Sequence, residues 1–180
     1  MEAGGLLFQV GNVPAMRQGF VLIEEKIPGA AHSWDTWVSP FLGEPDFVQA
    51  WVSDVEYDHW QNASDPIEYT VVGRDYSHLP LRSNGLPFPL EQLVIDTSAN
   101  PGRWTMRMGY IEAVGSTMWL GGNFWRAVGK EPGVAIDETV FRISSIEGNV
   151  VKVIALDQCF CDQSTAAIQD RLRINLFGNL

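Results

Sequence analysis

The chain has few of the residues on which most enzymes and metal sites depend. Its 180 residues include three histidines and two cysteines, with no Gly-x-x-x-x-Gly-Lys phosphate loop, Gly-x-Gly-x-x-Gly turn or Gly-x-Ser-x-Gly elbow. The histidines form neither a His-x-x-x-His nor a His-Glu-x-x-His pattern, and Cys159 and Cys161 have no second cysteine pair to complete a zinc site. We therefore expect a protein without catalytic residues, metal ions or cofactors.

Positive charge and long apolar runs are also scarce. Twelve basic residues stand against 22 acidic ones, and the formal net charge of −10 repels nucleic acid and anionic membranes and favours a cationic partner. No apolar stretch reaches the roughly 20 residues that span a bilayer, and the N-terminus lacks the basic n-region of a secretion signal. Cys159 and Cys161 are too close in a strand to close a disulfide easily. We expect a cytoplasmic protein with free thiols.

Hydrophobic residues, alanine and cysteine included, make up 46% of the chain. This content is enough for one domain with a buried core. Alternation of apolar and polar residues predicts six strands. They cover residues 20–27, 67–72, 92–96, 109–114, 139–146 and 150–156. The last two flank Glu147-Gly148-Asn149 and predict an antiparallel hairpin, in which Phe141 and Ile143 share a face with Val151 and Val153.

Helices are expected to be fewer. Residues 164–177 place Ile168, Leu172 and Leu176 four apart, with Asp162 or Ser164 as N-cap and Gly178 as the stop, which predicts an amphipathic helix. A stretch after Pro45 fits a helix or a strand, and residues 115–129 can hold a third helix despite Gly121-Gly122. Strands and helices do not alternate regularly. We therefore predict a single α+β domain, residues 1–180, with a mostly antiparallel or mixed sheet, a C-terminal amphipathic helix and one or two further helices.

An acidic segment is the strongest functional signal in the composition. Residues 44–75 hold eight acids, with Arg74 as the only lysine or arginine among them, and Trp51, Tyr57 and Trp60 interleaved. Asp54, Glu56 and Asp58 would share one face of a strand, and Asp54 and Asp58 would still be neighbours on a helix. Carboxylates beside aromatic residues are typical of a surface that meets a basic partner. The predicted partner-binding residues are Asp54, Glu56, Asp58, Trp60, Asp65, Glu68 and Asp75.

Other interpretations of these residues remain open. The acidic run also fits an ordinary solvated surface, in which case the partner surface would lie elsewhere, first around the loop at residues 86–89. Asp58, His59 and His78 are the best candidates for a metal site, and Ser98 and Ser116 for a nucleophile, but neither set forms a recognised motif. Trp104, Trp119 and Trp125 fit a ligand pocket as well as a core.

The segment from Ile95 to Trp125 carries a resemblance to a known class of proteins. Its motifs are Asn100-Pro101-Gly102-Arg103, then Gly109-Tyr110-Ile111-Glu112-Ala113-Val114-Gly115, then Met118-Trp119-Leu120-Gly121 with Phe124-Trp125. Together they resemble small immunity proteins that bacteria make against their own polymorphic toxins. The most similar family accompanies restriction-endonuclease-like toxins delivered by type VI secretion.

The resemblance implies a function for the whole chain. The protein would be a non-enzymatic antitoxin that binds a cognate nuclease toxin, expected to have a basic surface, and masks its active site or substrate groove. The alternative is a small ligand-binding or hydrolytic domain with an aromatic-lined pocket around Trp104 to Trp125.

Overall fold

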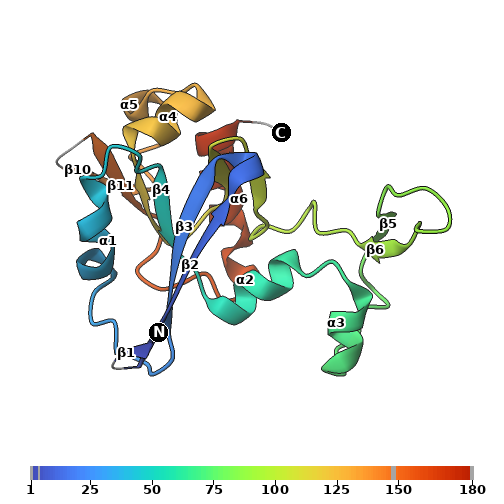
Figure 1. Cartoon of the computed structure of the whole chain (residues 1–180). Coiled ribbons are helices and arrows are strands. Elements are labelled where there is room, and N and C mark those ends of the chain that lie inside the picture. The colour runs from blue at the N-terminus through green and yellow to red at the C-terminus, as the bar shows by residue number, and fades with distance from the viewer. Residues whose placement is uncertain (1, 4, 147–148, 179–180) are drawn as a thin grey trace.

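A four-stranded antiparallel sheet forms the centre of the protein in a computed structural model that describes residues 2–3, 5–146 and 149–178 (Figure 1). Its strand order is β10 (Arg142–Ile146), β11 (Val150–Ile154), β9 (Thr117–Leu120) and β4 (Gln49–Val52). In the β10–β11 hairpin Ile143 pairs with Val153 and Ser145 with Val151, which confirms the predicted pairing and its apolar face. Residues 147 and 148 of the expected turn lie outside the described residues.

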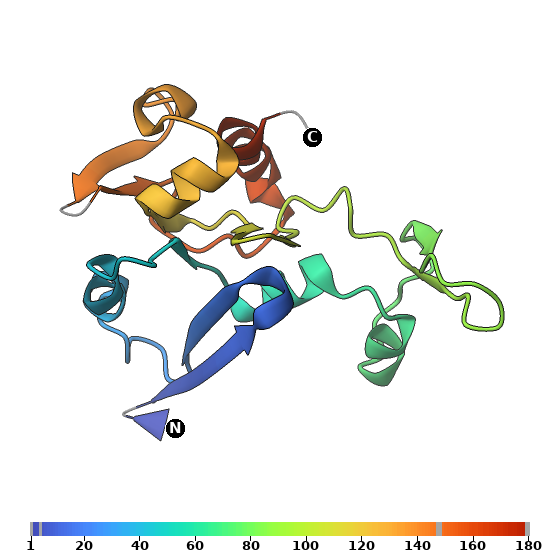
Figure 2. The ribbon, with the colours of Figure 1, turned by 45° about the horizontal axis from the view of Figure 1, so that its top comes forward.

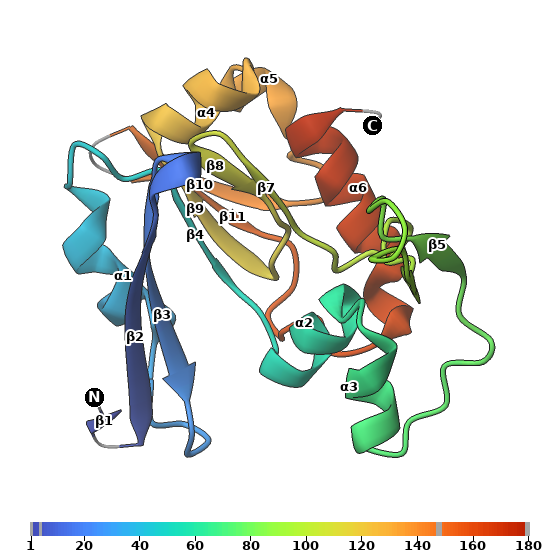
Figure 3. The same cartoon turned by 45° about the vertical axis from the view of Figure 1, so that its right-hand side comes forward.

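The sheet buries apolar side chains on both faces, because successive residues of a strand, such as those on either side of Trp119, point to opposite faces. Met118 and Val153 face a core completed by α4 (Gly122–Val128) and the C-terminal helix α6 (Ala166–Phe177). Trp119 faces the other way, against α1 (Trp34–Leu42), and the two helical layers lie on opposite sides of the sheet (Figure 3). Because both of its faces are covered, the sheet and its helices form a rigid body to which the other parts of the chain are attached.

A long hairpin lies beside α1. It is made of β2 (Leu6–Val13) and β3 (Gln18–Glu25) joined by the 3-10 turn η1 (Pro14–Met16), and β1 (Glu2–Ala3) pairs with β2. Gln18 donates hydrogen bonds to the main-chain oxygens of Arg107 and Tyr110, which belong to the small hairpin of β7 (Thr105–Arg107) and β8 (Tyr110–Glu112). The remaining short elements of the body are α5 (Pro132–Ala135) and η2 (Gln163–Thr165).

A lobe made of residues 63–99 projects away from this body (Figures 1 and 2). Helix α2 (Val55–Asn62) leads into it, and the lobe contains α3 (Pro66–Val71) and the two-stranded ribbon of β5 (Leu81–Ser83) and β6 (Leu93–Ile95). Its core is small: Ala63, Tyr69 and Ile95 are buried, with Trp60 and Tyr76 packed against them.

The predicted α+β class is confirmed, with every strand pair in the described residues antiparallel. Helix α6 is also confirmed, with Leu172 and Leu176 fully buried and Asp162 capping the preceding turn. The expectation of a strand at residues 67–72 is wrong, because this segment is helix α3. The segment after Pro45 forms strand β4, and residues 115–129 hold strand β9 before helix α4.

The short helices α1 to α5 are more numerous than the one or two expected. Among the described residues, no helix combines the length and the apolar character that crossing a membrane requires.

Candidate partner-binding surface

Asp54 begins helix α2, and the acidic triplet therefore lies on a helix, not on a strand. The Asp54 carboxylate accepts a hydrogen bond from the main-chain N–H of Tyr57 at 2.8 Å, the geometry of an N-cap. Glu56 and Asp58 follow in the first turn, where the helix dipole favours negative charge. Glu56 is exposed, whereas Asp54 and Asp58 are half-buried. Of the three, Glu56 is the carboxylate most open to a partner.

Asp58 lies partly inside the protein, between α2 and the residues that follow the lobe. Burial raises the pKa of its carboxyl group, and hydrogen bonding by Trp104 and the nearby His59 lower it by less. A carboxylate in this position stabilises the local structure less than an exposed one does. Asp58 is thus a weaker candidate for partner contact than its position in the sequence indicates.

Helix α3 begins with a similar cap. The Asp65 carboxylate accepts from the main-chain N–H of Ile67 at 2.9 Å, and Pro66 occupies the first helical position, where a missing N–H costs nothing. The two helices meet through His59 Nε2 and Glu68 Oε2, which are 3.4 Å apart. Asp65 and Glu68 therefore lie on the lobe next to helix α2, which carries Glu56.

Trp60, the predicted aromatic anchor, is already engaged inside the protein. Its ring packs against Tyr69 with centroids 4.8 Å apart and against His59 at 4.7 Å, and the Arg74 guanidinium lies 4.5 Å from its centroid. These contacts hold α2, α3 and the turn after α3 together. Trp60 supports the lobe and has little free surface to offer a partner.

Asp75 is exposed beyond α3 and organises the turn there. Its carboxylate accepts from the main-chain N–H of Ser77 at 2.9 Å, and this bond, together with His78 at 3.7 Å, lowers its pKa. His78 is thus engaged near Asp75, and His59 near Glu68. In the part of the chain that the structure describes, no three His, Cys, Asp or Glu side chains gather in a metal-binding arrangement.

The lobe and α2 gather most of the excess charge. Residues 54–99 contain eight acids and two arginines, so this quarter of the chain accounts for six of the ten net negative charges. The carboxylates predicted as partner-binding, apart from the engaged Asp58, lie along α2, α3 and the turn after α3. A stretch of chain with this balance produces a local negative potential that reaches about a Debye length, roughly 8 Å in physiological salt.

The chain enters and leaves the lobe at one clamped point. Gln61 at the end of α2 bonds to both Asn100 and Gly102, and the Asn62 side chain accepts from the main-chain N–H of Trp104 at 2.8 Å. The Asn100-Pro101-Gly102 turn is in turn held to α6 by Arg173, whose guanidinium donates to the oxygens of Pro101 and Arg103. Burial of Arg173 lowers its pKa to about 10. The clamp fixes the base of the lobe on the body.

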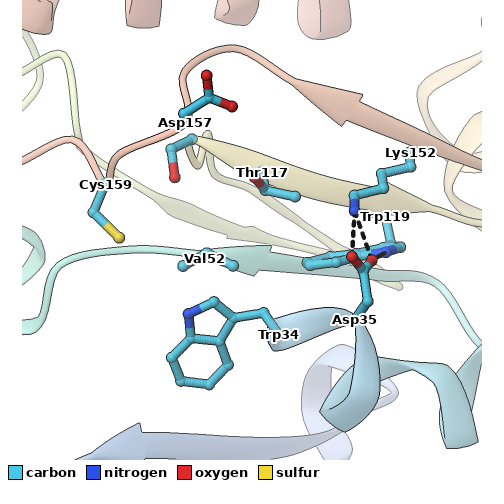
Figure 4. A pocket seen from close by; sticks show the side chains of 9 residues that line it. Trp34, Asp35, Val52, Thr117, Trp119, Lys152, Asp157 and Cys159 are labelled. Carbon is cyan, nitrogen blue, oxygen red and sulfur yellow. Dashed lines mark hydrogen bonds and ion pairs between the residues drawn. The ribbon is translucent and has the colours of Figure 1, made fainter. Parts of the chain in front are cut away.

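A small polar cavity of about 200 Å³ opens on the side of the sheet that faces α1 (Figure 4). Lys152 and Asp35 form an ion pair across it at 2.6 Å, over the Trp119 ring, whose N–H donates to Asp35. Cys159 also lines the cavity, and burial raises the pKa of its thiol despite a hydrogen bond with Ser116. The charges already neutralise one another, and the volume is below the ~300 Å³ at which ligand pockets begin.

The three tryptophans of the proposed aromatic pocket lie in different places. Trp119, 1% exposed, forms one wall of the small cavity, while Trp125, 4% exposed, lies under a separate groove of about 640 Å³ between α4 and the β10–β11 hairpin. Trp104, 38% exposed, lies at the clamp and lines neither space. Ser116 is buried, and Ser98 is exposed in a turn on the lobe.

The sequence did not reveal which apolar residues are exposed. Several large apolar side chains of the lobe face solvent: Ile67, Val71, Val72, Leu81, Leu86, Phe88, Leu90 and Leu93. The only sequence signal for their exposure is the cluster of prolines Pro80, Pro87 and Pro89, which indicates a loop on the surface.

Compared with known proteins, the chain matches no protein-family model, no curated protein and no solved structure.

Proposed function

We propose that this chain is an immunity protein that binds one cognate toxin and neutralises it by masking its active site or substrate groove. The toxin is a nuclease of the restriction-endonuclease-like kind delivered by type VI secretion. The resemblance of residues 95–125 to such immunity proteins supplies the class of partner.

One observation carries the proposal, namely the acidity of residues 54–99, which form helix α2 and the projecting lobe and together hold six net negative charges. A nuclease must present a basic groove to the phosphates of its substrate. An acidic surface is attracted to such a groove and competes with nucleic acid for it. Masking of this kind requires rigid attachment, and the clamp of Gln61, Asn62 and Arg173 supplies it.

The proposal requires that a toxin gene lies beside the gene for this chain. It is tested by co-expression of the two proteins. We expect cells that make both proteins to grow and cells that make the toxin alone to arrest. In purified form, an equimolar amount of this protein should abolish nucleic-acid cleavage. An unrelated acidic protein of similar size and charge is the control, because it separates specific masking from a general effect of negative charge.

Unchanged cleavage in a several-fold excess of this protein would contradict the proposal. A Ser98→Ala variant extends the test, because this side chain is exposed and is not needed for masking. It should protect as well as the parent does.

A further inference from the structure

The β5–β6 ribbon has an apolar face that the protein covers at one end only. Leu81 pairs with Ile95, and Ser83 pairs with Leu93, so Leu81, Leu93 and Ile95 project from the same face. Ile95 is buried in the core of the lobe, whereas Leu93, two residues along, is 62% exposed. A two-stranded ribbon is marginally stable without a second layer. This one has a second layer over only half of its apolar face.

The apolar surface continues into the loop at the end of the ribbon. Leu86 and Leu90 are exposed, and Phe88 between them is 91% exposed. Single exposed apolar residues are common on protein surfaces, but a set of five on one projecting ribbon is typical of an interaction site. The loop lies at the far end of the lobe from the body (Figures 1 and 2).

Hydrogen bonds inside the loop hold this tip in one shape. The Asn84 side chain donates to the main-chain oxygen of Leu90 at 2.9 Å and accepts from the N–H groups of Leu86 and Gln92. Leu90 also donates to the oxygen of Pro87 at 2.9 Å. A loop that is ordered before binding loses less conformational entropy when it docks. The loop therefore presents its apolar side chains as a fixed, convex knob.

The net charge of the lobe that carries the knob selects its occupant, because residues 63–99 hold five acids and two arginines. A second copy of this chain would bring another acidic lobe against the first, and like charges at close range repel. A basic protein surface is attracted instead, and a convex apolar knob needs a recess to bury it. Phe88 is the natural anchor, since Trp60 is engaged inside the protein.

We infer that the loop of residues 86–90, centred on Phe88, inserts into an apolar recess of the basic toxin groove while the carboxylates of α2 and α3 face its rim. This inference rests on the proposed function and identifies the anchor of the same interface. Buried aromatic anchors mainly set the dissociation rate, and rim charges mainly set the association rate. The loop and the carboxylates are thus distinguished by kinetics.

The test measures binding kinetics with an activity-deficient form of that toxin as the probe. Phe88→Ser should raise the dissociation rate about 30-fold or more and change the association rate by less than about threefold. Val134→Ser is the matched control: Val134 is 86% exposed, and its helix α5 lies far from the lobe (Figure 1). It should bind like the parent. Circular dichroism checks that both variants keep the fold.

Different failures have different meanings. If the parent inhibits the toxin and Phe88→Ser dissociates at the parent rate, the inference is overturned and the proposed function stands. If the parent does not bind the toxin, both fail. If sedimentation shows that the parent dimerises and Phe88→Ser does not, the knob is a self-association surface, and the inference is also overturned.

Discussion

Half of the eight carboxylates in residues 54–99 have a structural task as well as a charge. Asp54 and Asp65 cap helices, and Asp75 and Asp96 each accept from a main-chain N–H two residues on. Short polar side chains are favoured at such positions because they satisfy main-chain donors that would otherwise lack a partner. Part of the acidity therefore comes from turn and cap chemistry. Glu56, which makes no such bond among the described residues, is the clearest excess charge.

At Asp58 we predict that the substitution Asp58→Asn stabilises the protein at neutral pH. Burial raises the pKa of this carboxyl above the ordinary value of 3.8, so its contribution to stability is complete below 3.8 and is lost as the pH rises through the folded pKa. Asparagine carries no charge to desolvate and can still accept from Trp104. Thermal unfolding at pH 7 and pH 4 should show an advantage for Asp58→Asn that shrinks at the lower pH.

The control for this prediction is Glu56→Gln on the same helix. Its exposed side chain should change the melting temperature little at either pH. If Asp58→Asn melts below the parent at pH 7, the carboxylate's hydrogen bond from Trp104 is worth more than its desolvation costs.

The ribbon β5–β6 and the central strands β9 and β11 differ strongly in burial. Met118, Leu120 and Val153 are fully buried, whereas the ribbon is two-stranded and its apolar face is mostly exposed. We predict that in hydrogen exchange the amides of Leu81–Ser83 and Leu93–Ile95 exchange well before those of β9 and β11. Equal protection of ribbon and sheet would mean that the lobe opens only with the whole protein.

Adding a binding partner gives this prediction a second readout. A partner that covers the ribbon should slow its exchange and leave that of β9 and β11 unchanged.

The elements also show where sequence patterns are informative. Alternation located β3, β6, β8, β10 and β11, although β3 has no buried residue and β11 is buried on both faces. It failed at residues 67–72, where Ile67 and Val71 face solvent, so the apolar positions do not report burial. Asp65-Pro66, an N-cap followed by proline, was the better signal for this helix. Helix α1 and strand β2 were not anticipated.

The candidate surface was only partly accessible from sequence. The run of acids shows which residues of this stretch are charged, since charge depends on composition alone, and their contact with a partner stays a prediction. Whether Trp60 is free or Phe88 is exposed depends on which segments cover them, and the packing of Tyr69 and Arg74 on Trp60 comes from the tertiary fold. From the sequence alone, the loop at residues 86–89 is only the second candidate for the partner surface.

The net negative charge of the whole molecule is unevenly distributed, and it is densest in helix α2 and the lobe. Residues outside 54–99 make up three quarters of the chain but contribute only four of the ten net negative charges. Such an uneven distribution matters for association rates more than for the fold, because long-range attraction acts before contact. The position of a charge, and not its number alone, should then decide its effect on binding.

This reasoning gives a prediction for two variants with the same net charge. Asp54→Asn, Glu56→Gln and Asp58→Asn together remove three charges from α2, while Glu44→Gln, Asp46→Asn and Glu138→Gln remove three exposed charges outside residues 54–99. At low salt the α2 variant should associate with the toxin about three- to tenfold more slowly than the parent.

The second variant should associate almost as fast as the parent, and the salt dependence of the association rate should flatten only for the α2 variant. Asparagine keeps the helix cap at position 54, so the folded structure survives in both. Stopped-flow association rates from low to physiological salt provide the comparison. Equal slowing in the two variants would show that only net charge matters, and the α2 carboxylates would then be an ordinary solvated surface.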